Sequence, residues 1–414
     1  MARTPLQAAT RVLELFCPRK AQEGEIPHPT TGRWWLLRLG YYKLHCPKAS
    51  AGDRIWLIDH IVQLGKQRCL AVASVRLANL PARGECLELK DLEPLAILPV
   101  EASTGKIVHG QLEDLAAKVG VPQGILSDEG GDLVDGIKRF CVAYPGTAQL
   151  SDMPHKAACL VKRRLEKDDR WASFSTQVGQ TKFQTGQTEL AFLVPPKQRS
   201  KARYMNLQPL MKWSCRILKI VDQHPARVLA HCSAERLEEK FGWVREYRED
   251  IARWSRFKTL AAAAVDVVRR DGYSADTAAR LTARLLPLVS SDEDGKLRDE
   301  LVEFVREQSQ AAAPGVRLPG STEVLESSFG KLKALEGDHQ SMSFSGMLLA
   351  WAALCGPTTE DVIQKALHAT PVKLVQQWIT KHLGSTVQSK RRAAHQAVDP
   401  PRKKNEKTPI LTQG

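Results

Sequence analysis

The sequence lacks several features that would assign it to a particular class of protein. It contains no apolar run long enough to cross a bilayer and no charged-then-apolar leader, so we expect neither a membrane protein nor a secreted one. Its nine cysteines are scattered and include no Cys-x-x-Cys pair, which argues against a disulfide framework and against a structural zinc site. No internal repeat is visible. We therefore expect an intracellular protein that works in a reducing compartment.

The composition is that of an ordinary globular protein with an excess of positive charge. The 414 residues are 43% hydrophobic and 26% charged, which leaves room for two or three domains with their own cores. The formal net charge is +14, so polyanionic partners are favoured. Charge alone does not identify such a partner.

The amino-terminal segment is expected to be helical. Residues 5–16 have helical spacing, and Thr30 or Thr31 can cap a second helix that is basic and aromatic. Two short helices of this kind fit a DNA-reading helix-turn-helix. A plain helical hairpin with its tryptophans in the core fits equally well, and the sequence leaves both interpretations open.

From residue 53 onward the pattern predicts a mixed α/β sheet with helices on both faces. Strands are expected at 54–63, 68–75, 95–98, 124–127 and 147–150, and helices at 106–119, 132–143 and 155–165. The short run 95–98 stands between two prolines, so we expect it at an edge of the sheet.

From residue 168 to residue 316 the sequence changes to helical patterns. Helices are expected at 207–221, 234–252 and 277–288, followed by 343–354 and a helical pair between 360 and 383. The basic, proline-containing end of the chain, 389–414, is expected to be disordered.

An acid inside an apolar strand is the strongest chemical signal. Asp59 lies within the apolar run 55–62, where an unpaired carboxylate would be costly. A strand centre offers an acid no routine structural role. We therefore expect a cation, most usefully a metal ion, to compensate its charge.

Two later segments supply further acids. Asp128 ends a second apolar strand just before Gly130-Gly131, and Glu326 stands in the first turn of a helix beside Glu323. Helical spacing places Glu323, Glu326, Gly330 and Lys333 on one face. Lys333 is then placed for a phosphate. Asp128 can instead be a loop cap, and the two glutamates can simply complement the helix dipole.

Weaker signals lie near these acids. His155 follows the last expected strand and can steer a phosphate or a metal-bound water, although a helix-capping segment explains the same residues. The basic residues Lys197, Arg199, Lys201 and Arg203 alternate with neutral ones, which is typical of a DNA-backbone contact and also of a solvated linker.

Three motifs together carry a family resemblance. Ile58-Asp59-His60, the segment 126–130 and the segment 322–327 resemble those of a DDE transposase of a bacterial insertion sequence, in the ribonuclease-H-like, retroviral-integrase superfamily. The long, mostly helical gap between Asp128 and Glu326 resembles the insertion of hAT transposases. The spacing Glu326-x6-Lys333 matches part of the Tyr-Arg-Glu-Lys signature. Its tyrosine and arginine are absent, because Pro319 and Thr322 occupy their positions.

The resemblance implies a function and a set of partners. Asp59, Asp128 and Glu326 would hold two Mg²⁺ ions, or Mn²⁺, with Glu323 as the alternative third acid. The enzyme would cut transposon terminal repeats and join the 3′ hydroxyl to target DNA. It would work as a homo-oligomer at the nucleoid of the bacterial cytoplasm, with no membrane partner. The alternatives are a related nuclease without strand transfer and an inactive DNA-binding relative.

The resemblance also sets the expected organisation of the chain. We expect a small helical part at 1–47, a ribonuclease-H-like core at 48–167, an all-α insertion at 168–317, the second part of the core at 318–356, carboxyl-terminal helices at 357–388 and a disordered tail at 389–414.

Overall fold

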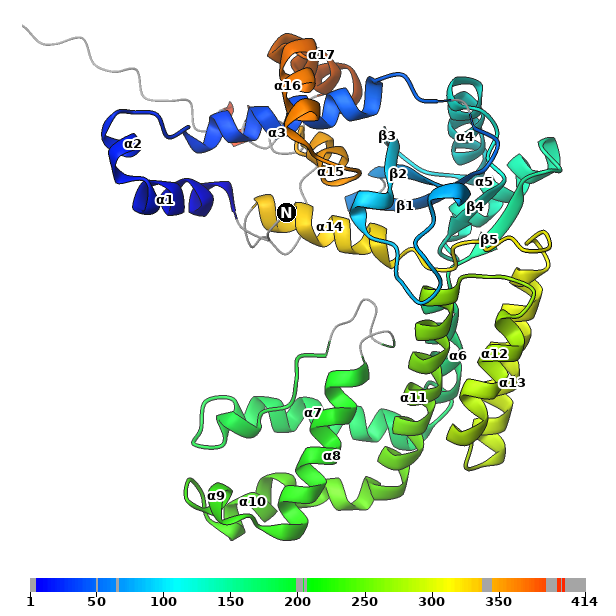
Figure 1. Ribbon diagram of the computed structural model, residues 1–414. Coiled ribbons are helices and arrows are strands. Elements are labelled where there is room, and N and C mark those ends of the chain that lie inside the picture. The colour runs from blue at the N-terminus through cyan, green and yellow to red at the C-terminus, as the bar shows by residue number, and fades with distance from the viewer. Residues whose placement is uncertain are drawn as a thin grey trace, which may run out of the picture.

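The computed structural model describes residues 5–49, 51–64, 67–198, 204, 207–336, 345–384, 393–395, 397 and 398. One sheet lies at one end of the molecule and a group of helices at the other (Figure 1). Among the helices of the described part, none is both long and apolar enough to cross a membrane. Most of the tail 389–414 lies outside the described residues.

The sheet has five strands: β1 (Arg54–Leu64), β2 (Gln67–Arg76), β3 (Glu93–Val100), β4 (Gly124–Ser127) and β5 (Ala148–Ser151). Their order is β3-β2-β1-β4-β5. The pairs β1–β2 and β2–β3 are antiparallel, whereas β1–β4 and β4–β5 are parallel. This mixed sheet confirms the five expected strands and the edge position of 95–98, and it is compatible with a ribonuclease-H-like core.

Helices cover both faces of the sheet because the strand residues alternate between two cores. Trp56 and Ile58 pack in a cluster with α4 (Gly105–Val119) and α5 (Gly131–Ala143). Ile55 and Leu57 belong to the larger cluster, together with residues of α6 (Met153–Leu165), α14 (Glu323–Glu336) and α15 (Leu348–Leu354).

The amino-terminal helices meet the carboxyl-terminal ones. After α1 (Leu6–Phe16) and α2 (Pro18–Gln22), helix α3 (Pro29–His45) begins directly after its N-cap His28, which lies two residues before Thr30, the earlier of the two expected caps. Gly40 lets α3 approach α15 so closely that an added Cβ would lie 1.8 Å from the carbonyl oxygen of Leu349. The buried Lys43 donates from Nζ to the carbonyl oxygen of Cys355 at 2.7 Å. Helices α16 (Glu360–Ala369) and α17 (Val372–Leu383) also contact α3.

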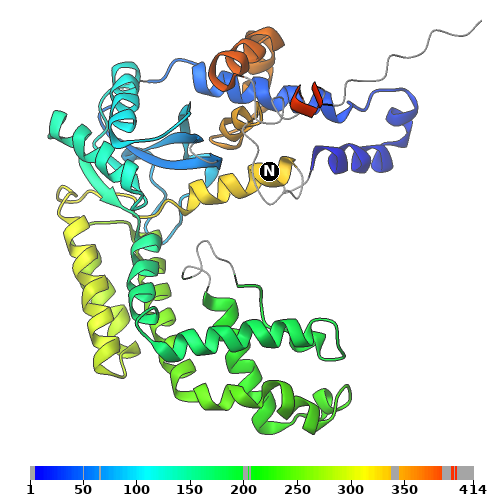
Figure 2. The ribbon, with the colours of Figure 1, turned by 180° about the vertical axis from the view of Figure 1, so that it is seen from behind.

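Two helices, α6 and α11 (Arg248–Asp271), run from the sheet into the helical group, as both views show (Figures 1 and 2). The rest of the group consists of α7 (Asp169–Thr185), α8 (Leu207–Gln223), α9 (Ala226–Leu229), α10 (Ala234–Phe241), α12 (Thr277–Leu285) and α13 (Asp292–Ser309). Its core is aromatic, with the rings of Trp171 and Trp254 edge-to-face at 4.9 Å between centroids. Short 3-10 helices lie at η1 (Leu77–Asn79), η2 (Leu89–Asp91), η3 (Ala191–Leu193), η4 (Gly242–Tyr247) and η5 (Leu286–Leu288).

The single helix expected at 234–252 is wrong. Helix α10 ends at Phe241, and the 3-10 segment η4 separates it from α11. Gly242 favours this ending, and the indole of Trp243 donates to the carbonyl oxygen of Lys240 at 3.1 Å. Arg245 forms ion pairs with Glu238 and Asp222. Asp222 lies outside the segment 234–252, so the periodicity of the segment does not indicate this contact.

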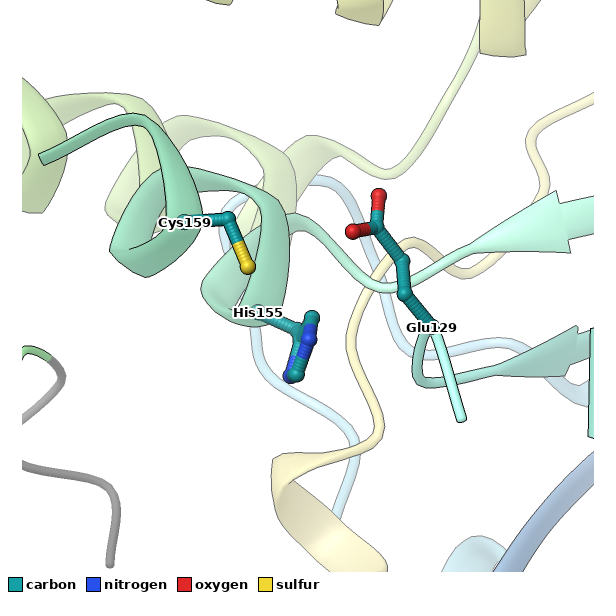
Figure 3. Close-up of side chains that lie close together, drawn as sticks. All are labelled: Glu129, His155 and Cys159. Carbon is teal, nitrogen blue, oxygen red and sulfur yellow. The ribbon is translucent and has the colours of Figure 1, made fainter. Parts of the chain in front are cut away.

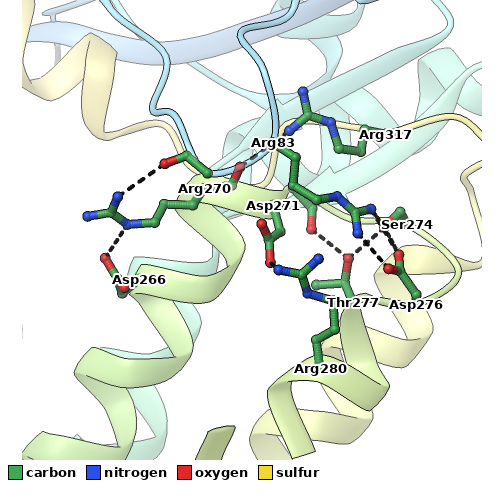
Figure 4. Close-up of polar contacts among 11 residues, drawn as sticks. Arg83, Asp266, Arg270, Asp271, Ser274, Asp276, Thr277, Arg280 and Arg317 are labelled. Carbon is green, nitrogen blue, oxygen red and sulfur yellow. Dashed lines mark hydrogen bonds and ion pairs between the residues drawn. The ribbon is translucent and has the colours of Figure 1, made fainter. Parts of the chain in front are cut away.

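Polar contacts fix the helical group to the sheet (Figure 4). Arg83, in the loop after β2, forms a bidentate ion pair with Asp276 at the start of α12. Arg317 donates to the carbonyl oxygens of Pro81 and Arg270. The segment that leads into α14 is therefore tied both to the sheet and to the end of α11.

Candidate metal and nucleic-acid site

Three acids occupy equivalent positions on three neighbouring parallel strands. Ile58 of β1 lies opposite Ser127 of β4, and Ser127 lies opposite Ser151 of β5. The next residue of each strand is an acid; these are Asp59, Asp128 and Asp152. Parallel pairing therefore sets the three acids in a row across the sheet, Asp128 and Asp152 just beyond the ends of their strands.

The three acids also face the same side of the sheet. The residues two positions before them, Leu57, Leu126 and Leu150, are all buried in the core that includes α6 and α14. Because side chains alternate along a strand, each acid points to the side of its leucine. The register of β1 and β2 shifts just after this point, between His60 and Val62, a kind of irregularity that often adjoins functional sites.

Helix α14 brings the fourth acid to this side. Leu325, Phe329 and Leu332 are buried against the core, as the helical spacing predicts. Glu326 points away from that buried face and is open to solvent at one side. Nevertheless the pKa of Glu326 is raised to about 7, first by the loss of water around it and then by the charges of Asp152, Glu323 and Asp128.

Asp59 is the most perturbed of the carboxyl groups in this row. Burial raises its pKa to about 8, and the negative charges of Asp128, Glu326 and Asp152 add to the effect. The backbone N–H of His60 donates to its Oδ1 at 2.6 Å and acts in the opposite direction. The structure thus brings together the three acids that the sequence indicated, close enough to repel one another.

Glu323, the alternative third acid, has a different partner. Arg269 of α11 donates from two nitrogens to its two carboxylate oxygens, at 2.6 and 2.7 Å. Among the described residues, Glu326 forms no ion pair. This pairing favours Glu326 over Glu323 as a ligand for a cation.

The donors suit hard divalent cations, because carboxylate oxygens are the ligands that Mg²⁺ prefers. A cation would also offset the mutual repulsion that raises the pKa of Asp59 and of Glu326. In the described part of the chain, the oxygens of Asp59, Asp128 and Glu326 do not all lie within 4.8 Å of one another. In this arrangement the three acids do not form a single closed set of ligands.

A second group of ligand atoms lies beside the acids. One oxygen of Glu129, one ring nitrogen of His155 and the sulfur of Cys159 lie within 4.8 Å of one another (Figure 3). His155 and Cys159 share a face of α6 because they are four positions apart. Lys156 already pairs with Glu129 at 3.7 Å. The side chain of His155 thus adjoins the acid row, whereas its backbone belongs to the first turn of α6.

Asp152 is a residue of the acid row that the sequence analysis does not single out. It is buried, and its Oδ2 accepts from the N–H of His155 at 2.8 Å, which caps α6. Its Oδ1 accepts from the N–H of Thr322 at 2.6 Å, one turn before Glu326. Burial raises the pKa of Asp152 to about 6, although both hydrogen bonds act to lower it. One carboxylate therefore holds the start of α14 against α6.

Replacing Asp152 should destabilise the protein and displace Glu326. In Asp152→Ala two backbone N–H groups lose their acceptor, and removing the buried charge offsets part of that loss, so we expect a cost of about 2 kcal/mol. Asp152→Asn keeps one acceptor and should cost about half as much. Denaturant unfolding measures both. Thr104→Ala is the matched control, because Thr104 caps α4 through the N–H of Ile107 only. Equal losses for Ala at both positions would contradict the double role of Asp152.

A cleft of about 1170 Å³ opens onto the acids of α14. Its walls include Glu323 and Glu326 on one side and the loop around residues 80–90 on the other. Five cationic side chains and two further acids, Glu85 and Glu88, also line it; the cations are Lys90, Arg269, Arg270, Arg317 and Lys331. Lys90, Arg269 and Arg270 pair with carboxylates, whereas Arg317 and Lys331 form no ion pair among the described residues and can contact a polyanionic strand near Glu326.

The other predicted binding residues are less informative. Lys333 is exposed on α14, as the helical stripe predicts. Arg199, Lys201 and Arg203 lie outside the described residues, so their role as a DNA contact stays a prediction.

Comparison with solved structures gives distant similarity, whereas the sequence comparisons give none. No family model matches the chain, and no curated protein matches it. A solved structure, the Drosophila P element transposase strand transfer complex, has a TM-score of 0.37 with 10% sequence identity, over 87% of this chain and 94% of that chain.

Proposed function

We propose that this protein is a DNA transposase whose metal ligands are Asp59, Asp128 and Glu326. The observation that carries the proposal is the parallel register of β1 and β4, which sets Asp59 beside Asp128 on the face of the sheet toward α14. The raised pKa values of Asp59 and Glu326 support it, because such perturbation is common in functional sites and rare on ordinary surfaces.

The chain would hold Mg²⁺ or Mn²⁺ by the carboxylate oxygens of Asp59, Asp128 and Glu326. When bound, two such ions supply charge stabilisation at the attacking and at the leaving oxygen of a phosphodiester. The residues of the chain orient these ions and neither attack the phosphorus nor leave it. Asp152 holds α14 in place, and Arg269 keeps Glu323 engaged, so that Glu326 is free to act as a ligand.

The reaction would proceed in two stages at the same acids. Hydrolysis frees a 3′ hydroxyl at the end of the element, and this hydroxyl then displaces a 3′ oxygen at a target phosphodiester, so that one phosphodiester forms as another breaks. Arg317 and Lys331 line the cleft beside Glu326, form no ion pair among the described residues, and are suited to contact the DNA backbone. The protein would act as a homo-oligomer that binds terminal repeats and target DNA at the bacterial nucleoid.

A strand-transfer assay tests the proposal. DNA from the ends of the transposon is labelled on the strand whose 3′ hydroxyl would be joined. It is then incubated with the protein, Mg²⁺ or Mn²⁺, and a supercoiled target plasmid. We expect metal-dependent nicking and label joined to the plasmid. Nicking without joining would identify a related nuclease, and binding without either product would identify an inactive DNA-binding relative. Either outcome rejects the transposase.

A further inference from the structure

The helical group contains a second basic site, well separated in the fold from the acids. A recess of about 800 Å³ lies between η3, α8, α9 and α11. Five cationic side chains line it, here named the cationic recess: Lys212, Arg216, Lys219, Arg227 and Lys258. Figures 1 and 2 place α8 and α9 in the helical group beyond α6 and α11, away from the sheet.

The lining of this recess has no negative charge. Among the described residues that form it, none is an aspartate or glutamate, and none of its five cations forms an ion pair. The arginines around it behave differently, since each has a carboxylate partner: Arg170, Arg236, Arg245, Arg248, Arg253 and Arg256. The recess therefore concentrates like charges that the protein itself does not neutralise.

Helical spacing arranges part of this charge in a line. Lys212, Arg216 and Lys219 lie on the exposed stripe of α8, while Trp213, with Ile217, is buried on the other face. At a rise of about 1.5 Å per residue the stripe is roughly 10 Å long. That length covers about three nucleotides of one DNA strand at roughly 3.4 Å each.

Like charges lie close together in the cationic recess, and an aromatic ring lies at its rim. Lys258 of α11 is half-buried, and the loss of water together with the charge of Lys212 lowers its pKa. At the rim, the ring of Phe192 is 46% exposed and lies edge-to-face on His231 at 5.9 Å between centroids. An exposed aromatic ring beside cations is a common feature of surfaces that bind nucleic-acid strands.

We propose that the cationic recess binds the phosphodiester backbone of DNA, as a contact separate from the acid row. The linear stripe favours an extended strand over a compact phosphate, because its charges are spread along the helix. Binding in the cationic recess and the proposed transposase activity both involve DNA, but they share nothing else. Binding in the recess requires no cleavage, so either proposal can fail without the other.

The test compares two variants of the full chain with the same loss of charge. The recess variant carries Lys212→Gln, Arg216→Gln and Lys219→Gln. The control carries Lys106→Gln, Lys118→Gln and Lys138→Gln, three exposed lysines of α4 and α5 that also form no ion pair among the described residues. Fluorescence anisotropy measures the binding of a short random-sequence duplex over a series of KCl concentrations, without divalent ions.

We expect the recess variant to bind at least about tenfold more weakly than the control. For this variant, the slope of the logarithm of the DNA association constant against log[KCl] should fall in magnitude by about 2 to 3. Each lost phosphate contact lowers the magnitude of that slope by about 0.9. Unchanged thermal unfolding verifies that both variants are folded. The proposal is overturned if the two variants bind alike, or if inorganic triphosphate occupies the recess while DNA binding stays at the control level.

Discussion

Asp59→Asn should abolish metal-dependent DNA cleavage while leaving DNA binding intact. The amide keeps the volume of the side chain but loses the charge that would hold two ions. If the ions contribute about 4 kcal/mol to transition-state stabilisation, the rate of nicking falls by roughly 10³-fold. The measurement is the initial rate of nicking of element-end DNA in Mg²⁺, with anisotropy as the binding readout.

Asp132→Asn is the matched control for this prediction. Asp132 lies in the first turn of α5, and its Oδ2 accepts from Nε2 of His60 at 2.9 Å. It therefore contacts the residue next to Asp59, but on the opposite face of the sheet. Its replacement should change the rate of nicking by no more than about threefold. Asp59→Cys adds a positive test, because a thiolate accepts Mn²⁺ more readily than Mg²⁺, and part of the activity should return in Mn²⁺. Cleavage by Asp59→Asn at the rate of the parent would remove Asp59 from the site.

Asp59→Asn should also stabilise the metal-free protein near neutral pH. The pKa of Asp59 is about 8 in the folded chain and ordinarily 3.8, so the folded state holds its proton more tightly than the unfolded state. The favourable contribution is complete below the ordinary value and is lost as the pH rises toward 8. Glu326 acts in the same direction between 4.5 and about 7. In EDTA, the free energy of unfolding of the parent should therefore decrease from pH 5 to pH 8.

Asp59→Asn removes the larger part of that dependence. At pH 8 it should be more stable than the parent by about 2 to 4 kcal/mol, which is less than the pKa difference alone implies because the side chain is partly hydrated. Mg²⁺ should stabilise the parent at this pH and have little effect on the variant, because bound cations favour the folded state. Urea unfolding in EDTA and in Mg²⁺, at constant ionic strength, measures both. Equal stabilisation of parent and variant by Mg²⁺ would place the cations elsewhere.

Much of the sheet could be predicted from the sequence because its signals are local. The apolar runs of β1 and β4 and the run 95–98 between two prolines lie where the pattern indicates, although β3 extends past both prolines. Asp59 and Asp128 could be selected as candidates because each interrupts or ends such a run. Glu326 followed from the amphipathic spacing of α14. The break after Phe241 and the second bond of Asp152 could not be predicted, since both depend on partners far along the chain, such as Asp222 and Thr322.

The sequence by itself determined the strands, the polarity of each helix face and the identity of the acids, because these depend on side-chain periodicity over a few residues. Only the tertiary structure decided which acids meet. The parallel register added Asp152 to the row, and Arg269 engaged Glu323 and left Glu326 open. It also gathered Lys212, Arg227 and Lys258 from three helices into one recess. Such convergence depends on long-range packing, which no local pattern encodes.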